Sequence, residues 1–264
     1  MPNTSAAIMR LSVAIEAAAD YAARLAPDNV KASTRDPQEP NKERKARFDR
    51  QMAALLKQHF DQQRADVSRY LESGGRLPLP DYLLNDTAIQ AEITKLLLAA
   101  AKDGIINVTT QTGLGFDNTL TNKDAARWAS QYAGELIKGV DKTSLDVVRS
   151  AIADFADKPG FTIGDVISQL PYDQARAERI AVTEITRAYA ESNQIAGEQI
   201  AKEFGDVPVV KIWWTNNDDR VCPVCGPLNG KEVGIKAEFT GGISNPPAHP
   251  NCRCWTTTTT KITP

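Results

Sequence analysis

Several motifs that mark enzyme sites are missing from this sequence. It has only two histidines and four cysteines among 264 residues, and it contains no His-Glu-x-x-His or Gly-x-Ser-x-Gly motif. The segment Gly113-Leu114-Gly115 is not followed by Gly-Lys-Ser/Thr, which a phosphate-binding loop requires. These absences argue against a zinc protease, a serine hydrolase and a P-loop nucleotide-binding protein. We therefore expect that the protein is not an enzyme.

An excess of charge and a long apolar run are also missing. The 31 basic residues nearly balance the 33 acidic ones, and the net charge of −2 indicates no general attraction to nucleic acid or to a membrane. No apolar run approaches the ~20 residues that a membrane-spanning helix needs. The N-terminus shows no secretory signal, so we expect a reducing compartment in which the thiols stay free.

The cysteines that are present are gathered in one short stretch. All four lie between Cys222 and Cys254, together with His249. Cys222-Pro-Val-Cys225 and His249-Pro-Asn-Cys252 share the form ligand-Pro-x-ligand, and Cys254 follows the second motif. Thiolates and imidazoles at this spacing are typical ligands of tetrahedral Zn²⁺. We assign Cys222, Cys225, His249 and Cys252 as ligands of a structural zinc ion. Cys254 is a rival to Cys252, because residues two apart in an extended segment lie on the same face.

Three other uses of these residues stay open. Disulfide bonds would need an oxidising compartment. A redox Cys-x-x-Cys pair at a helix N-terminus is disfavoured, because Gly226, Pro227 and Gly230 follow the second cysteine and break a helix. A catalytic zinc ion needs an open coordination position and normally a carboxylate or a second imidazole, whereas only one histidine is in reach.

The first 121 residues are predicted to be mainly helical. Apolar residues at steps of three and four predict helices over residues 6–25 and 41–72, and Gly74-Gly75 should end the second one. His59 lies in this helix with no second ligand nearby, so we take it as a structural residue. Residues 27–41 have the composition of a flexible linker.

A third helix should begin after Asn85 or Asp86 and end at Gly104. The segment Ile105–Gly115 is rich in glycine and threonine, and we expect it to form a loop or a short strand. Further on, capping residues, glycines and prolines divide residues 122–204 into separate helices. These helices are expected over residues 122–139, 143–158, 163–170 and 172–204.

Beyond Gly205 the pattern changes to that of short strands. Val207–Thr215 and Arg253–Ile262 are rich in β-branched residues, and Asn229-Gly230 is typical of a hairpin turn. Three or four such strands are too few to bury a core alone, so we expect zinc to supply the missing stability. The predicted fold class is α+β, with mainly helical N-terminal and central regions and a small C-terminal β module built around the Cys/His site.

Five linked motifs in the second half of the chain resemble those of one family. They are Arg176–Tyr189, Trp214-Thr215, Asp218–Cys225, Leu228–Lys231 and Pro247–Cys254. In this order they resemble the phage Mu protein F-like (phage head morphogenesis) domain of minor head proteins. The resemblance implies a Mu F-like domain over residues 122–264. Within that domain, helices would span 122–204 and the zinc-stabilised β module 205–264. No family motif covers residues 1–121, where we expect a helical region whose apolar faces contact the portal or another partner.

The resemblance also implies a function. Proteins of this family are minor capsid proteins of tailed bacteriophages, which associate with the portal protein inside the head and assist head assembly, DNA packaging or DNA ejection. The major capsid protein, a scaffold protein and the packaged DNA are further partners that it implies, and no membrane is among them. The protein would reside in the virion near the portal, and in the host cytoplasm during assembly.

Several family positions carry over to numbered residues of this chain. The Thr-Glu pair of the family falls on Thr183 and Glu184, and its Asp-Asp-Arg motif falls on Asp218, Asp219 and Arg220. The family often has arginine before the Thr-Glu pair, where this chain has Val182. Any salt bridge made from that position is therefore lost.

Two hypotheses for Glu184 stay open. It could pair with an arginine near the cysteines and dock the helices on the zinc module, or it could form a local i,i+3 pair with Arg187. Either aspartate of the Asp-Asp-Arg motif could accept backbone N–H groups of a turn, or bind Arg220 or Arg253.

Two functions outside this family also stay open. A zinc-ribbon-like nucleic-acid-binding protein would need a dense basic patch around the cysteines. The sequence offers there only Arg220, Lys231, Lys236, Arg253 and Lys261. A metal-dependent hydrolase or toxin would need a catalytic motif, and none of those named above is present.

Overall fold

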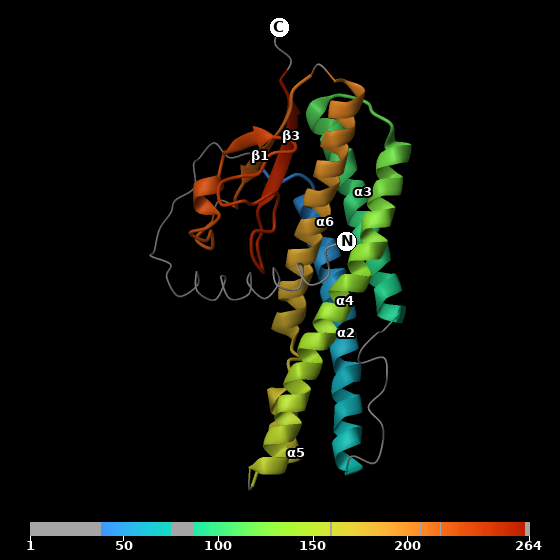
Figure 1. Cartoon of the computed structure of the whole chain (residues 1–264), viewed down its shortest axis with the longest axis vertical. Helices are drawn as coiled ribbons and strands as arrows, with labels where there is room; N and C mark the ends of the chain where they lie inside the picture. The colour runs from blue at the N-terminus through green and yellow to red at the C-terminus, as the bar shows by residue number, and fades with distance from the viewer. Residues whose placement is uncertain (1–37, 75–86, 159, 206, 217, 262–264) are drawn as a thin grey trace, which may run out of the picture. The chain divides into compact units, whose positions relative to one another are not determined.

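The computed structural model describes residues 38–74, 87–158, 160–205, 207–216 and 218–261. Within these residues the elements, in chain order, are α2 Lys42–Glu72, α3 Thr87–Thr112, α4 Asn118–Asp157, α5 Ile163–Gln169, α6 Gln174–Glu203, β1 Val209–Trp214, the 3₁₀ helix η2 Gly226–Leu228, β2 Glu232–Gly234 and β3 Trp255–Thr260 (Figure 1). The predicted α+β class is confirmed. The helix predicted over residues 6–25 and most of the predicted linker over 27–41 lie outside the described residues.

Helix α2 confirms the prediction for residues 41–72, including its end. The N–H of Gly74 donates to the carbonyl of Leu71 at 3.0 Å. Gly74 has a φ of 67°, in the left-handed region that glycine adopts without steric cost. The chain therefore leaves the helix where the sequence predicted.

The prediction that a helix ends at Gly104 is wrong. Helix α3 continues through this glycine to Thr112 and ends before Gly113, whose φ is 68°. A Cβ atom at Gly104 would collide with the Oγ atom of Ser192, so glycine here permits the close approach of α3 and α6. The threonines of the expected loop donate to carbonyls four residues earlier, which keeps them helical. They are Thr109, Thr110 and Thr112.

The predicted break at Gly139 is also wrong, because α4 is one continuous helix of 40 residues. Thr143 and Ser144, which were expected to start a new helix, donate instead to the carbonyls of Gly139 and Val140, both at 2.9 Å. A glycine inside a helix costs about 1 kcal/mol relative to alanine. Burial of neighbours such as Val140 and Val148 offsets a cost of this size.

Helix α5 starts where the sequence predicted, and α6 starts two residues after its predicted start at residue 172. The Thr162 hydroxyl accepts the N–H of Asp165 at 3.2 Å, and the Asp165 carboxylate accepts the N–H of Thr162 at 2.7 Å. This capping box starts α5. Helix α6 follows Asp173, whose carboxylate accepts the N–H of Arg176 at 2.6 Å.

The three strands form an antiparallel sheet of order β2-β1-β3. In its register, Val210 of β1 lies opposite Gly234 of β2 and Thr259 of β3. Asn229-Gly230 is not the tip of a two-residue hairpin, contrary to the prediction. It lies at the end of the long connection from β1 to β2, where Asn229 Oδ1 accepts the N–H of Thr215 at 2.8 Å and so closes the base of the loop.

The chain divides into two compact units, each built from separate segments. Of the described residues, unit 1 contains 38–48, 97–128 and 182–261, and unit 2 contains 49–74, 87–96 and 129–181. Helices α2, α3, α4 and α6 each contribute to both units. These units differ from sequence domains, so the division predicted at residue 122 stays a prediction.

Unit 2 has an apolar core with a buried polar pair. The rings of Phe60 and Tyr172 lie 5.7 Å apart, and the Arg176 guanidinium lies 4.8 Å from the Phe60 ring. His59 is buried, and its Nε2 atom lies 2.8 Å from a carboxylate oxygen of Asp141. This bond joins α2 to α4 and gives His59 a structural role.

Unit 1 has a core that joins helices to the sheet. Its buried members come from α3, α4, α6, the sheet and the loops: Ala101, Ile105, Val108, Phe116, Ala125, Ala196, Ile200, Val209 and Ile235. The sheet therefore buries apolar side chains against the helices, in addition to the contacts between its own strands. This packing was not part of the sequence prediction.

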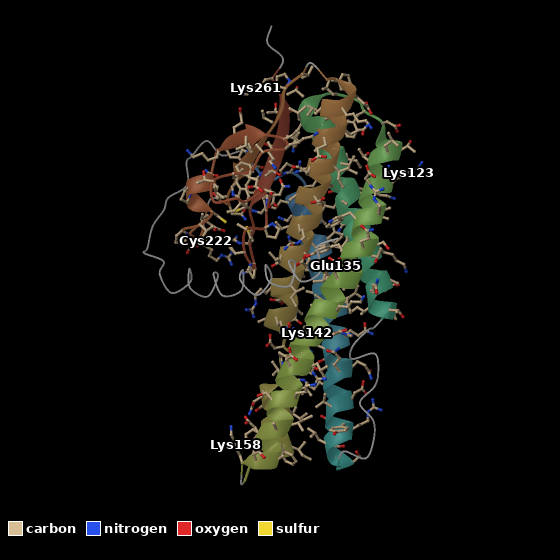
Figure 2. The ribbon with its side chains drawn as sticks, in the orientation of Figure 1. Lys123, Glu135, Lys142, Lys158, Cys222 and Lys261 are labelled. Carbon is tan, nitrogen blue, oxygen red and sulfur yellow. The ribbon has the colours of Figure 1, made fainter. Side chains whose placement is uncertain are left out.

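The outer surface of α4 is charged. Exposed side chains such as Glu135 and Lys142 lie along it, and the exposed Lys158 follows its last residue (Figure 2). Local pairs of opposite charge, such as Lys142 with Asp146 at 3.2 Å, are solvated and contribute little stability. In the described part of the chain, no helix has both the length and the apolar character that crossing a membrane requires.

Candidate metal centre

Two turns of the same kind carry the predicted metal ligands. In the first turn, the N–H of Cys225 donates to the carbonyl of Cys222 at 3.1 Å. In the second, the N–H of Cys252 donates to the carbonyl of His249 at 3.2 Å. A proline follows the first residue of each turn and fixes its own φ. Each turn thus has a donor side chain at its first and its last position.

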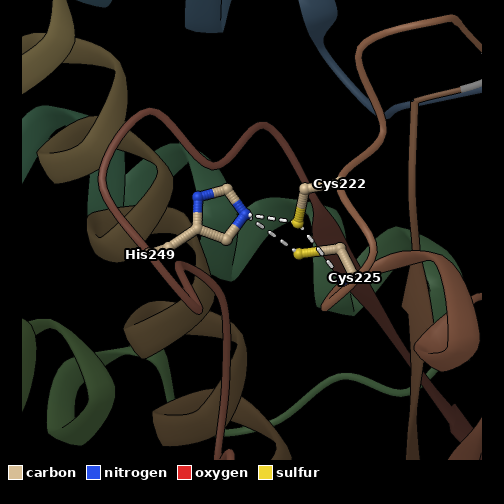
Figure 3. Close-up of side chains that lie close together, drawn as sticks. All are labelled: Cys222, Cys225 and His249. Carbon is tan, nitrogen blue, oxygen red and sulfur yellow. Dashed lines mark hydrogen bonds between the residues drawn. The ribbon is translucent and has the colours of Figure 1, made fainter. Parts of the chain in front are cut away.

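The turns bring the donor atoms into contact. The Nε2 atom of His249 lies 3.0 Å from the sulfur of Cys222 and 3.3 Å from that of Cys225 (Figure 3). The Cys225 and Cys252 sulfurs are 3.8 Å apart. Two sets of three donors have all their atoms within 4.8 Å of one another: Cys222, Cys225 and His249, and Cys225, Cys252 and Cys254. All five residues predicted from the sequence therefore meet around Cys225.

This geometry fits a tetrahedral metal ion. A zinc–sulfur bond of ~2.3 Å places two sulfurs of a tetrahedron ~3.8 Å apart, which agrees with the Cys225–Cys252 distance of 3.8 Å. The Nδ1 atom of His249 lies 2.8 Å from the carbonyl oxygen of Pro250, to which only an N–H can donate. Nε2 is then the unprotonated nitrogen, whose lone pair can bind a metal ion. Metal-binding histidines are commonly oriented by a backbone partner in this way.

Hydrogen bonds among these side chains shift their pKa values. The hydrogen bond from Cys225, with help from His249, lowers the pKa of Cys222 to about 4, and the hydrogen bond to Cys222 raises the pKa of Cys225. The pKa of Cys252 is lowered by its hydrogen bond with Cys225. Burial opposes the charged form of His249, but its bond to Cys222 and the charge of Cys252 raise its pKa to about 9. A divalent cation can take the place of these protons.

The donors make up much of the small core next to the sheet. Its buried members are Trp213, Cys225, Leu228, Phe239, Cys252 and Cys254. Cys222 and His249 are half-buried and border a hollow of about 250 Å³, which Asn216, Arg220 and Asn251 also line. The cluster is therefore closed on the side of the core and partly open on the other.

The structure also shows how Cys252 and Cys254 differ. Cys252 ends the second turn as Cys225 ends the first, whereas Cys254 lies beyond the turn and immediately before β3. Both are buried, with 1% and 5% of their surface exposed. A four-coordinate ion would leave one of the five donors over. The assignment of Cys222, Cys225, His249 and Cys252 stays a prediction that the turn geometry favours.

Helix α6 contacts the second turn through Thr183. The N–H of Asn251 donates to the Thr183 hydroxyl oxygen at 2.7 Å. Asn251 has a φ of 60°, which asparagine tolerates better than most residues. Glu184 accepts a hydrogen bond from Arg187 Nε at 3.0 Å, so the local i,i+3 pair that was one of the two hypotheses is present.

Asp218 links the approach to the first turn with the second turn. Its carboxylate accepts two hydrogen bonds from the Arg253 guanidinium, at 2.6 and 2.8 Å, and a third from the N–H of Arg220 at 3.1 Å. Both uses expected of the Asp-Asp-Arg motif thus occur in Asp218. The bond from Arg253 lowers the pKa of Asp218. Asp219 and Arg220 are exposed.

Sequence reasoning missed two buried polar residues of unit 1. Lys211 of β1 donates to the carbonyl of Ser244 at 2.7 Å and to Gln194 Oε1 at 3.0 Å. Asn193 of α6 donates to the carbonyl of Thr256 at 2.9 Å. Neither belongs to a motif, and a polar residue in a strand or helix carries no local signal that it is buried.

Comparison with known proteins bears on the same segment. Residues 148–257 match the family model described as Phage Mu protein F like protein. The chain carries a phage Mu protein F-like segment. The resemblance expected from the motifs is thus confirmed over this range, which runs from within α4 into β3 and includes the metal cluster. No curated protein and no solved structure gives a significant match.

Proposed function

We propose that the Cys/His cluster binds one structural Zn²⁺ ion through Cys222, Cys225, His249 and Cys252. The spacing of the two turns and the Cys225–Cys252 distance of 3.8 Å support this ligand set. Three thiolates and one neutral imidazole would hold the ion, and Cys254 would stay a thiol beside it. The ion would tie the loop after β1 to the loop before β3.

The zinc proposal is tested by metal analysis of the full chain and of two serine variants. We expect one zinc ion per wild-type chain and, after exchange with Co²⁺, the absorption spectrum of a tetrahedral site with thiolate ligands. Cys252→Ser should weaken metal binding strongly, whereas Cys254→Ser should retain the wild-type spectrum. If instead Cys254→Ser loses the metal and Cys252→Ser keeps it, the ligand set is wrong, and absence of bound metal in all three proteins refutes the site.

We further propose that the protein is a minor head protein of a tailed bacteriophage, with a structural rather than an enzymatic role. The observation that carries this proposal is the Mu F-like match over residues 148–257, which contains the metal cluster and the part of α6 that contacts it. In this proposal the protein binds the portal protein within the head and assists head assembly, DNA packaging or DNA ejection. It would be carried in the virion after assembly in the host cytoplasm.

This role is tested with the portal protein of the phage that encodes the chain. Zinc-loaded chain mixed with purified portal should co-sediment with it, and tagged chain should be found in purified heads in few copies. Cys225→Ser should weaken both results if the metal module is needed, and Cys254→Ser serves as the matched control. A chain that neither co-sediments with the portal nor enters heads contradicts the proposal.

Binding to nucleic acid has weaker support. Of the basic residues near the cysteines, Arg253 is bonded to Asp218 and Lys261 pairs with Glu232. Paired cations are less available to neutralise phosphates. We expect at most weak DNA binding that disappears at physiological salt, which filter binding at several salt concentrations would measure.

A further inference from the structure

A second cavity in unit 1 is lined mainly by residues of α3, α6 and β3, and Cys254 of the metal cluster borders it. About 340 Å³ of space lies between its lining residues, part of it open to solvent. Four of its lining residues carry a buried side-chain atom with no hydrogen-bond partner among the described residues: Gln111 Nε2, Thr186 Oγ1, Asn193 Oδ1 and Trp255 Nε1. Thr186, Asn193 and Trp255 are each more than nine-tenths buried.

The donor and acceptor roles of the two amides are set by their other contacts. Gln111 Oε1 accepts the backbone N–H of Thr258 at 2.9 Å, so its Nε2 group must be the unpartnered end. Asn193 Nδ2 donates to the carbonyl oxygen of Thr256 at 2.9 Å, so Oδ1 must be its unpartnered end. Reversing the Gln111 amide would place its NH₂ group against the N–H of Thr258, and reversing the Asn193 amide would place its oxygen against the carbonyl of Thr256.

The unpartnered atoms therefore form a mixed set. Gln111 Nε2 and Trp255 Nε1 are donors, Asn193 Oδ1 is an acceptor, and the Thr186 hydroxyl can act as either. The two charged lining residues, Glu39 and Lys45, have buried side chains and form an ion pair at 2.6 Å. A carboxylate would meet the Asn193 oxygen, and an ammonium group would meet the two N–H donors. An uncharged group that both donates and accepts satisfies the set.

We propose that this cavity binds an amide group, supplied either by a small uncharged amide or by a peptide segment of a partner. An amide carbonyl would accept from Gln111 and Trp255, and an amide N–H would donate to Asn193. This site goes beyond the proposed head function and does not depend on it. Burial of unpaired donors and acceptors is unfavourable, so a bound group that pairs with them stabilises the folded protein.

The test follows the indole N–H signal of Trp255 by NMR in the zinc-loaded full chain, with Trp255→Phe used to assign it. The probes are acetamide, for a small amide, and N-acetylglycine N-methylamide, for a peptide. Acetate and methylammonium are the charged controls, since each offers only acceptors or only donors. We expect a saturable shift with one or both amides, which identifies the source, and none with either ion.

Thr186→Val removes one hydroxyl with little change of shape and should weaken amide binding about fivefold. Thr110→Val, on the exposed side of α3, should leave it unchanged. An unshifted Trp255 signal with both amides overturns the proposal, because water alone then fills the cavity. An equal shift with all four probes overturns it as well.

Discussion

The two packed regions with the most different cores are unit 2 and the small cluster around the cysteines. Unit 2 buries large apolar side chains from several helices, among them Met52, Leu56, Phe60 and Ile137. In the cysteine cluster, three of the six buried members are cysteines. Apolar burial spreads stability over many side chains, whereas a metal-centred core depends on a few atoms. Damage to the two regions should therefore have different consequences.

The largest effect is expected from Cys225→Ser, because this sulfur belongs to both sets of donors. Loss of structural zinc removes stabilisation on the order of 10 kcal/mol from a small module. Hydrogen exchange should show loss of protection in the loops and strands after residue 207, while α2 and α4 in unit 2 stay protected. Cys254→Ser is the control. Simultaneous loss of protection in unit 2 would show that the two regions are not separable.

Phe60→Ala makes the opposite change, in unit 2. Truncation of this fully buried ring, which packs on Tyr172 and Arg176, should lower the free energy of unfolding by about 3–5 kcal/mol. Metal analysis of the folded variant should still give the wild-type zinc content. The same substitution at Phe155, which is 37% exposed, should cost well under 1 kcal/mol. A Phe60→Ala protein that folds but loses zinc would contradict the comparison.

A smaller effect is expected where α6 meets the second turn. Thr183→Val removes the acceptor of the Asn251 N–H and should cost about 1–2 kcal/mol. Competition with a chelator should show weaker zinc binding, because the turn that carries His249 and Cys252 is less well held. Glu184→Ala removes a local pair with Arg187 and should cost well under 1 kcal/mol. The reverse order would favour docking through Glu184 instead.

The smallest effect concerns Asp218, and it depends on pH. Since the Arg253 bond lowers the pKa of Asp218 in the folded protein, it stabilises the fold above the unfolded value of about 3.9 and is lost as the pH falls through the folded value. Asp218→Asn should reduce the free energy of unfolding at pH 7 by about 1 kcal/mol or less. The difference from wild type in urea unfolding should shrink below about pH 4. Asp219→Asn, at an exposed position, should show no such difference.

Local signals predicted helix ends well where a side chain or a left-handed glycine acts alone. Thr162 with Asp165 and the end of α2 at Gly74 are examples. The same reasoning was wrong at Gly104 and Gly139. At Gly104 a side chain would collide with Ser192 on another helix, and no local pattern contains this contact. At Gly139 the following hydroxyls bond within the helix instead of capping a new one.

By itself, the sequence determined the α+β class, the five candidate metal donors and the resemblance to the Mu F-like family, because spacing and residue type act over a few neighbouring positions. The tertiary structure alone decided which distant groups meet. It placed Thr183 against Asn251, joined the sheet to α3 and α6, and left unpaired polar atoms around one cavity. Such contacts depend on how separate segments pack, and a linear pattern of residues does not contain that information.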